Sequence, residues 1–251
     1  MSDRALTLEQ IRCIERGALA EGLPLMQRAG AAAAAFAQGH LAPGARILAL
    51  AGPGNNGGDA LVTARLLRAR GYAVEVVLPA DPGKFPRDAA EAYAQWREAG
   101  GVERKALPDI ARGGVPDPVA DSLPDLVVDR LPDLVVDRLP DQLIDRLPDL
   151  VIDGLFGIGL SRPLGPDWQA LVDTVNGWGC PILALDIPSG LEAQTGEALG
   201  RPIRATWTIA FIAPAQALLT PQGRAVAGEC VCDRLGLTES MIARYLERSS
   251  Y

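Results

Sequence analysis

The spacing of apolar residues predicts helices and strands that alternate along most of this 251-residue chain. Apolar positions three or four residues apart predict a helix over 6–20 with Thr7 as its N-cap, and an alanine-rich helix over 25–38. Short buried runs predict strands over 45–51, 72–78, 150–153, 181–186, 206–213 and 230–235. Further helices are expected up to residue 70 and over 87–100, 167–178 and 238–248. Strands that alternate with helices indicate a parallel sheet, so we expect an α/β fold, a doubly wound αβα sandwich.

A tandem repeat interrupts this pattern. Leu-Pro-Asp recurs every eight residues, starting at 123, 131, 139 and 147, and each copy is followed by an apolar segment and an aspartate. Units of eight residues are too short to stack as solenoid modules. Only the last copy continues into a glycine loop, so we interpret 150–153 as a strand of the sheet and 121–146 as a repeat insertion within a single domain spanning 1–251. The alternative is that the repeat supplies extra edge strands or a partner-binding arm.

Composition narrows the classes of function. A formal charge of −7 argues against nucleic acid as a partner, and the apolar run over 29–37 is too short to cross a membrane. The N-terminus lacks the apolar core of a signal peptide, so we expect a cytoplasmic protein. His40 is the single histidine, which disfavours a Ser-His-Asp triad or a histidine-rich zinc site. The four cysteines are expected to be buried thiols rather than a disulfide framework.

A glycine-rich loop follows the strand predicted at 45–51. Gly52, Gly54 and Gly57 have the G-x-G-x-x-G spacing that brings a pyrophosphate close to a helix N-terminus. Asp59, which the pattern places at the start of the next helix, would compete with a phosphate there. One interpretation is that Asp59 caps the helix. The other is that the loop binds sugar hydroxyls or a ring amide while the phosphates lie further along.

Two aspartates end predicted strands. Asp153 and Asp186 each follow a buried run and precede a glycine-bearing loop, at 154–163 and 187–190. In open parallel sheets the ligand crevice lies beyond the carboxyl ends of the strands, so we expect both aspartates to lie near a ligand. Arg162 adds a fork of hydrogen-bond donors suited to phosphate. The three loops together predict one site at this edge of the sheet.

These motifs closely resemble the NAD(P)H-hydrate epimerase family. The resemblance rests on residues 54–59, 153–163 and 185–191, with weaker support from 25–30, and it covers about 5–237 apart from the repeat. It implies a Rossmann-like three-layer αβα sandwich with a mainly parallel central sheet, usually a homodimer. It also implies an isomerase that interconverts the R and S forms of hydrated NADH and NADPH (NADHX and NADPHX) in cofactor repair, alongside an NAD(P)H-hydrate dehydratase, separate or fused.

The resemblance also assigns roles to residues. Asp186 would be the catalytic acid/base, and a potassium ion would be held by Asn56, Asp153 and Ser189. The substrate-binding residues would be Asn55, Asn56, Gly57, Gly58, Asp59, Gly157, Ile158, Gly159, Leu160, Ser161, Arg162, Pro163 and Asp186.

One departure bears on activity. The family often has a lysine where this chain has Ala215, and neither Lys84 nor Lys105 lies in that segment. The alternative function is therefore a non-catalytic nucleotide-binding or protein-interaction module of the same fold.

Overall fold

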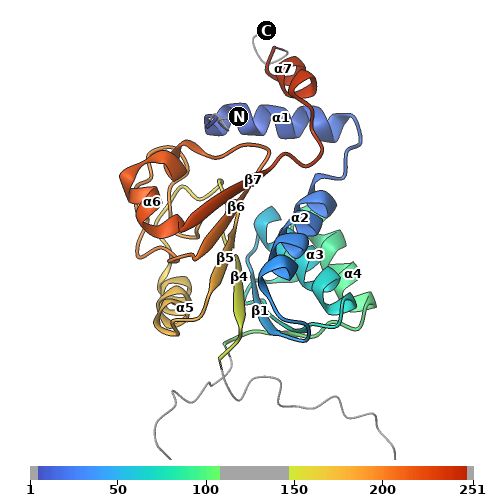
Figure 1. The fold of residues 1–251 in the computed structure, drawn as a ribbon, viewed down its shortest axis with the longest axis vertical. Helices are drawn as coiled ribbons and strands as arrows, with labels where there is room; N and C mark the ends of the chain where they lie inside the picture. The colour runs from blue at the N-terminus through green and yellow to red at the C-terminus, as the bar shows by residue number, and fades with distance from the viewer. Residues whose placement is uncertain (1–4, 108–146, 248–251) are drawn as a thin grey trace, which may run out of the picture. The chain divides into compact units, whose positions relative to one another are not determined.

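The computed structural model describes residues 5–107 and 147–247, which form one compact unit apart from residue 147 (Figure 1). A second unit, 108–147, lies outside the described residues except for its last residue. The repeat insertion predicted over 121–146 lies wholly in that part, so its structure stays a prediction. None of the helices within the described ranges is long and apolar enough to cross a membrane.

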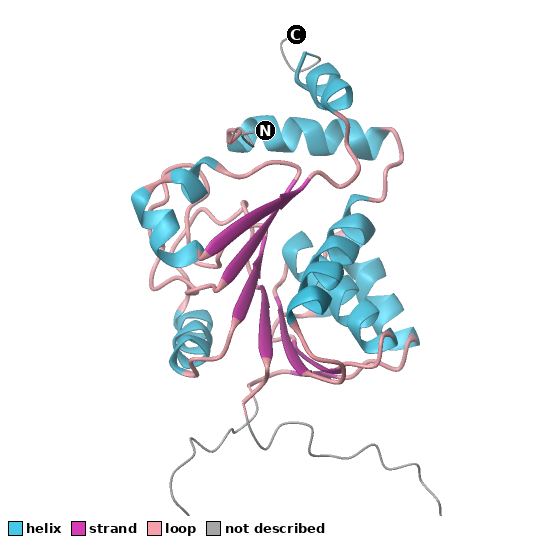
Figure 2. Cartoon of the chain, viewed as in Figure 1, coloured by secondary structure: helices cyan, strands magenta, loops and turns pink. Residues whose placement is uncertain are grey.

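A seven-stranded sheet, with every pairing parallel, forms the middle layer of the unit (Figure 2). In chain order its strands are β1 (Arg46–Ala51), β2 (Ala73–Val77), β3 (Glu103–Arg104), β4 (Leu150–Gly154), β5 (Ile182–Leu185), β6 (Trp207–Phe211) and β7 (Glu229–Asp233). The spatial order is β3-β2-β1-β4-β5-β6-β7, so the direction of winding reverses between β1 and β4. Such a switch point leaves a crevice beyond the strand ends, and the Rossmann-like prediction is confirmed.

Helices cover both faces of this sheet. They are α1 (Leu8–Ala20), α2 (Leu25–His40), α3 (Asn55–Ala69), α4 (Arg87–Glu98), α5 (Pro166–Gly177), α6 (Pro221–Ala227) and α7 (Glu239–Glu247), with short 3₁₀ turns at Pro82–Lys84 and Gln216–Leu219. Figure 1 shows α2, α3 and α4 on one face and α5 and α6 on the other, while α1 crosses the end of the sheet. Both faces of the sheet are therefore buried, which explains why β1, β4 and β5 are almost continuous apolar runs.

Small residues allow α2 to pack closely on α3. Ala29, Ala33 and Ala34 of α2 are buried, and a methyl group added at Gly30 would collide with Val62 of α3. The alanine-rich sequence of α2 therefore sets how closely α3 approaches it. Since α3 begins at the glycine-rich loop, this packing also fixes the position of that loop.

The structure corrects the expected start of α3. The helix begins at Asn55, with Gly54 at the N-cap position and no side-chain cap, so Asp59 lies in the second turn and does not cap the helix. Gly57 and Gly58 are part of the helix because its first turn is packed tightly. A side chain at Gly57 would collide with the carbonyl oxygen of Gly52, and one at Gly58 would collide with Met26.

Three further differences separate the expected and observed elements. The two-residue strand β3 and the seven-residue helix α6 are too short to give a periodic signal, and the sequence did not predict them. All four cysteines are free, and Cys13 is buried as expected. Cys180 and Cys232, however, are only partly buried, and Cys230 is exposed because β7 is the edge strand of the sheet.

Candidate functional site

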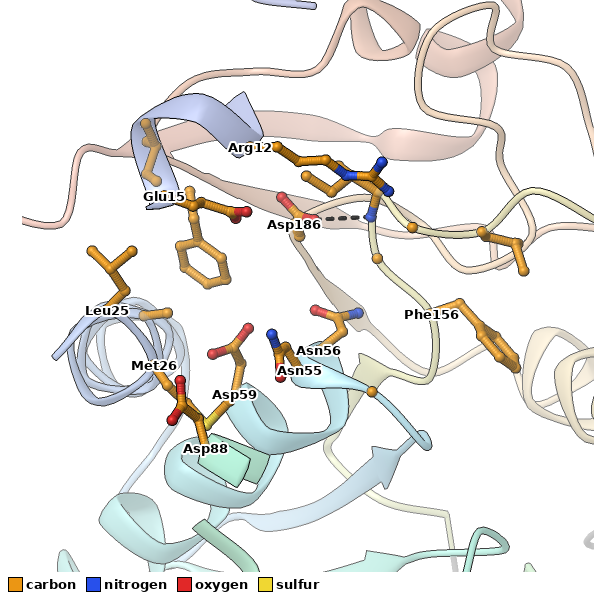
Figure 3. A pocket seen from close by; sticks show the side chains of 18 of the residues that line it. Arg12, Glu15, Leu25, Met26, Asn55, Asn56, Asp59, Asp88, Phe156 and Asp186 are labelled. Atoms are coloured by element: carbon orange, nitrogen blue, oxygen red, sulfur yellow. Dashed lines mark hydrogen bonds between the residues drawn. The ribbon is translucent and has the colours of Figure 1, made fainter. Parts of the chain in front are cut away.

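A pocket of about 660 Å³ lies beyond the carboxyl ends of the central strands (Figure 3). Its lining comes from the loops after β1, β4, β5, β6 and β7, together with the first turns of α3 and residues of α1, α2 and α4. This is the edge predicted from the strand-end aspartates, at the switch point between β1 and β4. The three glycine-bearing loops therefore do meet at one site.

Asp186 lines this pocket and links two of its loops. Its Oδ2 accepts a hydrogen bond of 3.1 Å from the backbone N–H of Ile158, which ties the loop after β5 to the loop after β4. Gly157 permits this approach, because a methyl group there would lie 2.9 Å from the same oxygen and 3.4 Å from Asn56 Cβ. Burial raises the pKa of Asp186 to about 6, while the Ile158 N–H opposes the rise. The carboxyl group can therefore gain or lose a proton near neutral pH.

Asp153 and Ser189 lie together behind the pocket. Both are fully buried, and the Asp153 carboxylate accepts hydrogen bonds of 2.6 Å from Ser189 Oγ and 2.8 Å from Ser189 N. Leu155 N donates a third bond at 3.2 Å. Burial raises the pKa of Asp153 to about 6 even though these bonds lower it. No basic side chain of the described residues forms an ion pair with Asp153, so its charge has no compensating cation from the protein there.

Asn56 stands at the floor of the pocket with an unsatisfied side chain. It is 8% exposed, and neither its amide oxygen nor its amide nitrogen has a hydrogen-bond partner. Its backbone carbonyl lies beside Gly154, at the end of β4, where a methyl group would come within 2.7 Å. A buried amide without partners costs about 1–3 kcal/mol, which is typical of a position that binds a ligand or an ion.

Three further carboxyl groups line the pocket. Asp59 was predicted from the glycine loop, but Glu15 of α1 and Asp88 of α4 were not. Burial, followed by the negative charge of Asp186, raises the pKa of Glu15 to about 7, while Arg12 and Arg16 lower it. Burial, Asp186 and Glu15, in that order, raise the pKa of Asp59 well above its usual range. Figure 3 shows the Glu15 carboxyl group pointing toward Asp186, with Asp59 near Asn55 and Asn56.

Backbone strain also concentrates at this pocket. Asp186, Ile212 and Leu235 are the non-glycine residues of the described part of the chain with positive φ, at 66°, 68° and 54°. All three line the pocket. Left-handed backbone is unusual for a β-branched residue such as Ile212, and strain of this kind clusters at functional sites.

Most of the predicted binding residues line the pocket, and some do not. Gly57 and Gly58 lie inside the first turn of α3, where they permit close packing, and Pro163 lies outside the lining. Asp153 and Ser189 lie behind it. The predicted residues that line it are Asn55, Asn56, Asp59, Gly157, Ile158, Gly159, Leu160, Ser161, Arg162 and Asp186. Their roles as substrate contacts stay predictions.

The position of the missing lysine is also defined. Ala215 is 3% exposed and pairs with Leu6 as an isolated bridge, so it does not line the pocket. The basic residues of the pocket lining are Arg12 from α1 and Arg162 from the loop after β4. Sequence analysis missed Arg12 and Glu15, since an amphipathic helix does not reveal which element its polar residues will face.

Comparison with known proteins identifies the family. The model of the YjeF-related protein N-terminus matches residues 22–217. NAD(P)H-hydrate epimerase of Bordetella parapertussis is 48% identical over 94% of this chain and 90% of its own length, and that of Achromobacter xylosoxidans is 49% identical over 92% and 95%. A bifunctional NAD(P)H-hydrate repair enzyme of Leishmania braziliensis is 35% identical over 87% of this chain and 34% of its own length.

A solved structure supports the fold. The crystal structure of yeast ynu0 superimposes with a TM-score of 0.71 over 96% of this chain and 93% of its own, at 16% identity. At that identity the likeness concerns the fold alone, and it agrees with the parallel sandwich described above. The family itself follows from the sequence matches: the chain belongs to the YjeF-related N-terminal family, in which its similar relatives are NAD(P)H-hydrate epimerases.

Proposed function

We propose that the protein interconverts the R and S forms of NADHX and NADPHX. The observation that carries this proposal is the Asp186 carboxyl group, held by the Ile158 N–H in a pocket where three loops meet. Close relatives that cover nearly the whole chain are named NAD(P)H-hydrate epimerase, which supports the same reaction here. A pocket of about 660 Å³ falls in the usual range of ligand sites.

Asp186 would act as the general acid/base at the hydroxyl-bearing carbon of the nicotinamide ring. In the protonated form it would give its proton to the hydroxyl group, the C–O bond would break, and water would leave an iminium-like ring. Water would then add to the opposite face to give the other epimer. With a pKa of about 6, Asp186 populates both protonation states near neutral pH.

In this proposal Asn56, Asp153 and Ser189 would hold a potassium ion. The described residues contain no group of three or more His, Cys, Asp or Glu side chains placed to hold a metal. Asn56, Asp153 and Ser189 instead offer an amide, a carboxylate and a hydroxyl, the oxygen donors that hard cations prefer. The amide has no partner and the buried carboxylate has no basic partner among the described residues, so both suit a cation. When bound, the ion would supply positive charge that lets a phosphate approach the nearby carboxylates.

The remaining parts of the proposal concern location and partners. Arg12 and Arg162 are the basic residues of the pocket lining, so we assign the dinucleotide phosphates to that side. A reducing compartment such as the cytoplasm fits four free cysteines. Longer relatives are named bifunctional NAD(P)H-hydrate repair enzymes, which supports a dehydratase, separate or fused, that would consume the product. We also propose that two copies of the protein form a homodimer.

A coupled assay tests this function. R-NADHX is mixed with an S-specific dehydratase, and formation of NADH is followed with and without the protein. The wild-type protein should accelerate NADH formation, and Asp186→Asn should lower the rate by about 10²–10⁴-fold. Asp167→Asn, at an exposed position in the first turn of α5, is the matched control and should keep the wild-type rate.

Two outcomes would contradict the proposal. Nucleotide binding without acceleration by the wild-type protein would favour the non-catalytic module. Asp186→Asn protein with the full rate would remove Asp186 from the chemistry.

A further inference from the structure

Epimerisation places a chemical demand on both faces of the ring. The hydroxyl group must leave from one face as water, which requires a proton, and water must add to the other face, which releases a proton. A single carboxyl group on one face meets only half of this demand. The pocket should therefore contain a second group that exchanges protons, located across the ring from Asp186.

We propose that Glu15 is this second acid/base group, so that Asp186 and Glu15 each serve one face of the ring. The inference rests on the proposed function. Glu15 belongs to α1, which crosses the end of the sheet, whereas Asp186 follows β5, so the two carboxyl groups reach the pocket from different elements. Figure 3 shows the Glu15 carboxyl group pointing toward Asp186.

The charges around Glu15 suit this role. It faces Asp59 of α3 and Asp186, while Arg12 and Arg16 of its own helix stabilise its ionised form. Burial and Asp186 raise the pKa of Glu15 to about 7, against about 6 for Asp186. Of this pair, Glu15 therefore holds the proton more firmly, so near neutral pH the transferable proton resides mainly on Glu15.

Asp59 is less suited to the second role. Burial and both neighbouring carboxylates raise its pKa well above the usual range, which disfavours the ionised form that a proton acceptor needs. It also lies on α3 beside Asn55 and Asn56 (Figure 3). A neutral carboxyl group there can donate a hydrogen bond to the substrate.

Protons and electrons balance in the loss and addition of water. Glu15 gives its proton to the hydroxyl oxygen, the C–O electron pair leaves with that oxygen as water, and the ring nitrogen supplies electrons to the iminium-like ring. A second water adds from the face of Asp186, which takes the proton. One proton has then moved from Glu15 to Asp186, and it returns through solvent or in the reverse reaction.

Oxygen isotope exchange tests the assignment. Each pure epimer is incubated in H₂¹⁸O with wild-type or Glu15→Gln protein. The epimers are then separated, and the ¹⁸O content of each is measured by mass spectrometry. In the variant, inversion should fall by about 10²–10⁴-fold. Asp186 can still remove and restore the hydroxyl group on its own face, so one epimer should incorporate ¹⁸O without inversion, at least about 10-fold faster than it inverts.

The variant of the other carboxyl group, Asp186→Asn, provides a second test. Asp186→Asn should retain exchange without inversion in the opposite epimer, because Glu15 then serves the remaining face. Formate should restore part of the inversion rate to Glu15→Ala, since a small carboxylic acid can replace the missing group. Glu9→Gln, an exposed carboxyl group in the first turn of the same helix, is the matched control and should behave as wild type.

The outcomes separate the two proposals. Wild-type protein that fails to invert either epimer would contradict the proposed function itself. Wild-type inversion combined with an unimpaired Glu15→Gln variant would overturn only the role of Glu15. Equal losses of inversion and exchange for both epimers in a folded Glu15→Gln variant would overturn it as well, because one face should remain served.

Discussion

A methyl group added at Gly157 would enter the space that the Asp186 carboxylate occupies. The new atom would lie 2.9 Å from Asp186 Oδ2, which is too close for two non-bonded atoms, and 3.4 Å from Asn56 Cβ. Gly157→Ala should therefore displace the carboxylate and break its 3.1 Å hydrogen bond from Ile158 N. Gly157 lies in a loop rather than in a helix or strand, so the effect on folding should be small.

The magnitude follows from that hydrogen bond. A hydrogen bond to a charged group contributes about 1.5–3 kcal/mol. Because the bond stabilises the ionised form, its loss should raise the pKa of Asp186 above its value of about 6, by roughly one to two units at about 1.4 kcal/mol per unit. The rate at neutral pH should then fall by about 10–100-fold, and the pH of maximal rate should move upward.

The assay is the coupled conversion of R-NADHX, measured from about pH 5 to 9. Gly39→Ala in α2 is the matched control, because a methyl group there meets nothing within 4 Å. That control should keep the wild-type rate and gain about 0.5–1 kcal/mol of stability. The free energy of unfolding of Gly157→Ala should change by less than about 1 kcal/mol in urea. A Gly157→Ala protein with the wild-type rate and pH profile would refute the reasoning.

Two further predictions concern the proposed ion site. Asn56→Leu removes a buried amide without partners, so the free energy of unfolding in urea should rise by about 1 kcal/mol, while the dependence of activity on KCl, relative to choline chloride, should disappear. Unchanged potassium dependence would contradict the assignment. The folded-state pKa of Asp153, about 6, lies above the ordinary 3.8, so its contribution to stability is lost as pH rises from about 4 to 6. Without potassium, the free energy of unfolding of the wild-type protein should fall over this pH range by on the order of 2–3 kcal/mol more than that of Asp153→Asn. Added KCl should restore this free energy at pH 7.5 but should have no effect at pH 4. Equal effects of KCl at both pH values would contradict this.

Regular patterns made the layered fold predictable. The apolar runs of β1, β4 and β5 predicted buried parallel strands, and Thr7 caps α1 with the capping box that its sequence allows. The start of α3 was not predictable, because Gly57 and Gly58 lower helix propensity. Their place in the helix depends on contacts with Gly52 and Met26, which only the tertiary structure supplies.

The candidate site was predictable only where it follows strand ends. Asp153 and Asp186 were found because the carboxyl ends of parallel strands meet at one edge. Glu15 was not, since it lies on an amphipathic helix that is remote in the sequence from the other loops. The left-handed backbone at Ile212 was also unpredictable, because nothing local favours it and the surrounding packing imposes it.

The most direct measurement follows one purified epimer of NADHX by chromatography that separates the R and S forms. The protein, in potassium buffer, should convert either pure epimer to the same equilibrium mixture. The initial rate should increase in proportion to the protein concentration. Conversion at the rate of the protein-free control, across a hundredfold range of protein concentration that spans ~0.1–10 μM, would contradict the assigned reaction.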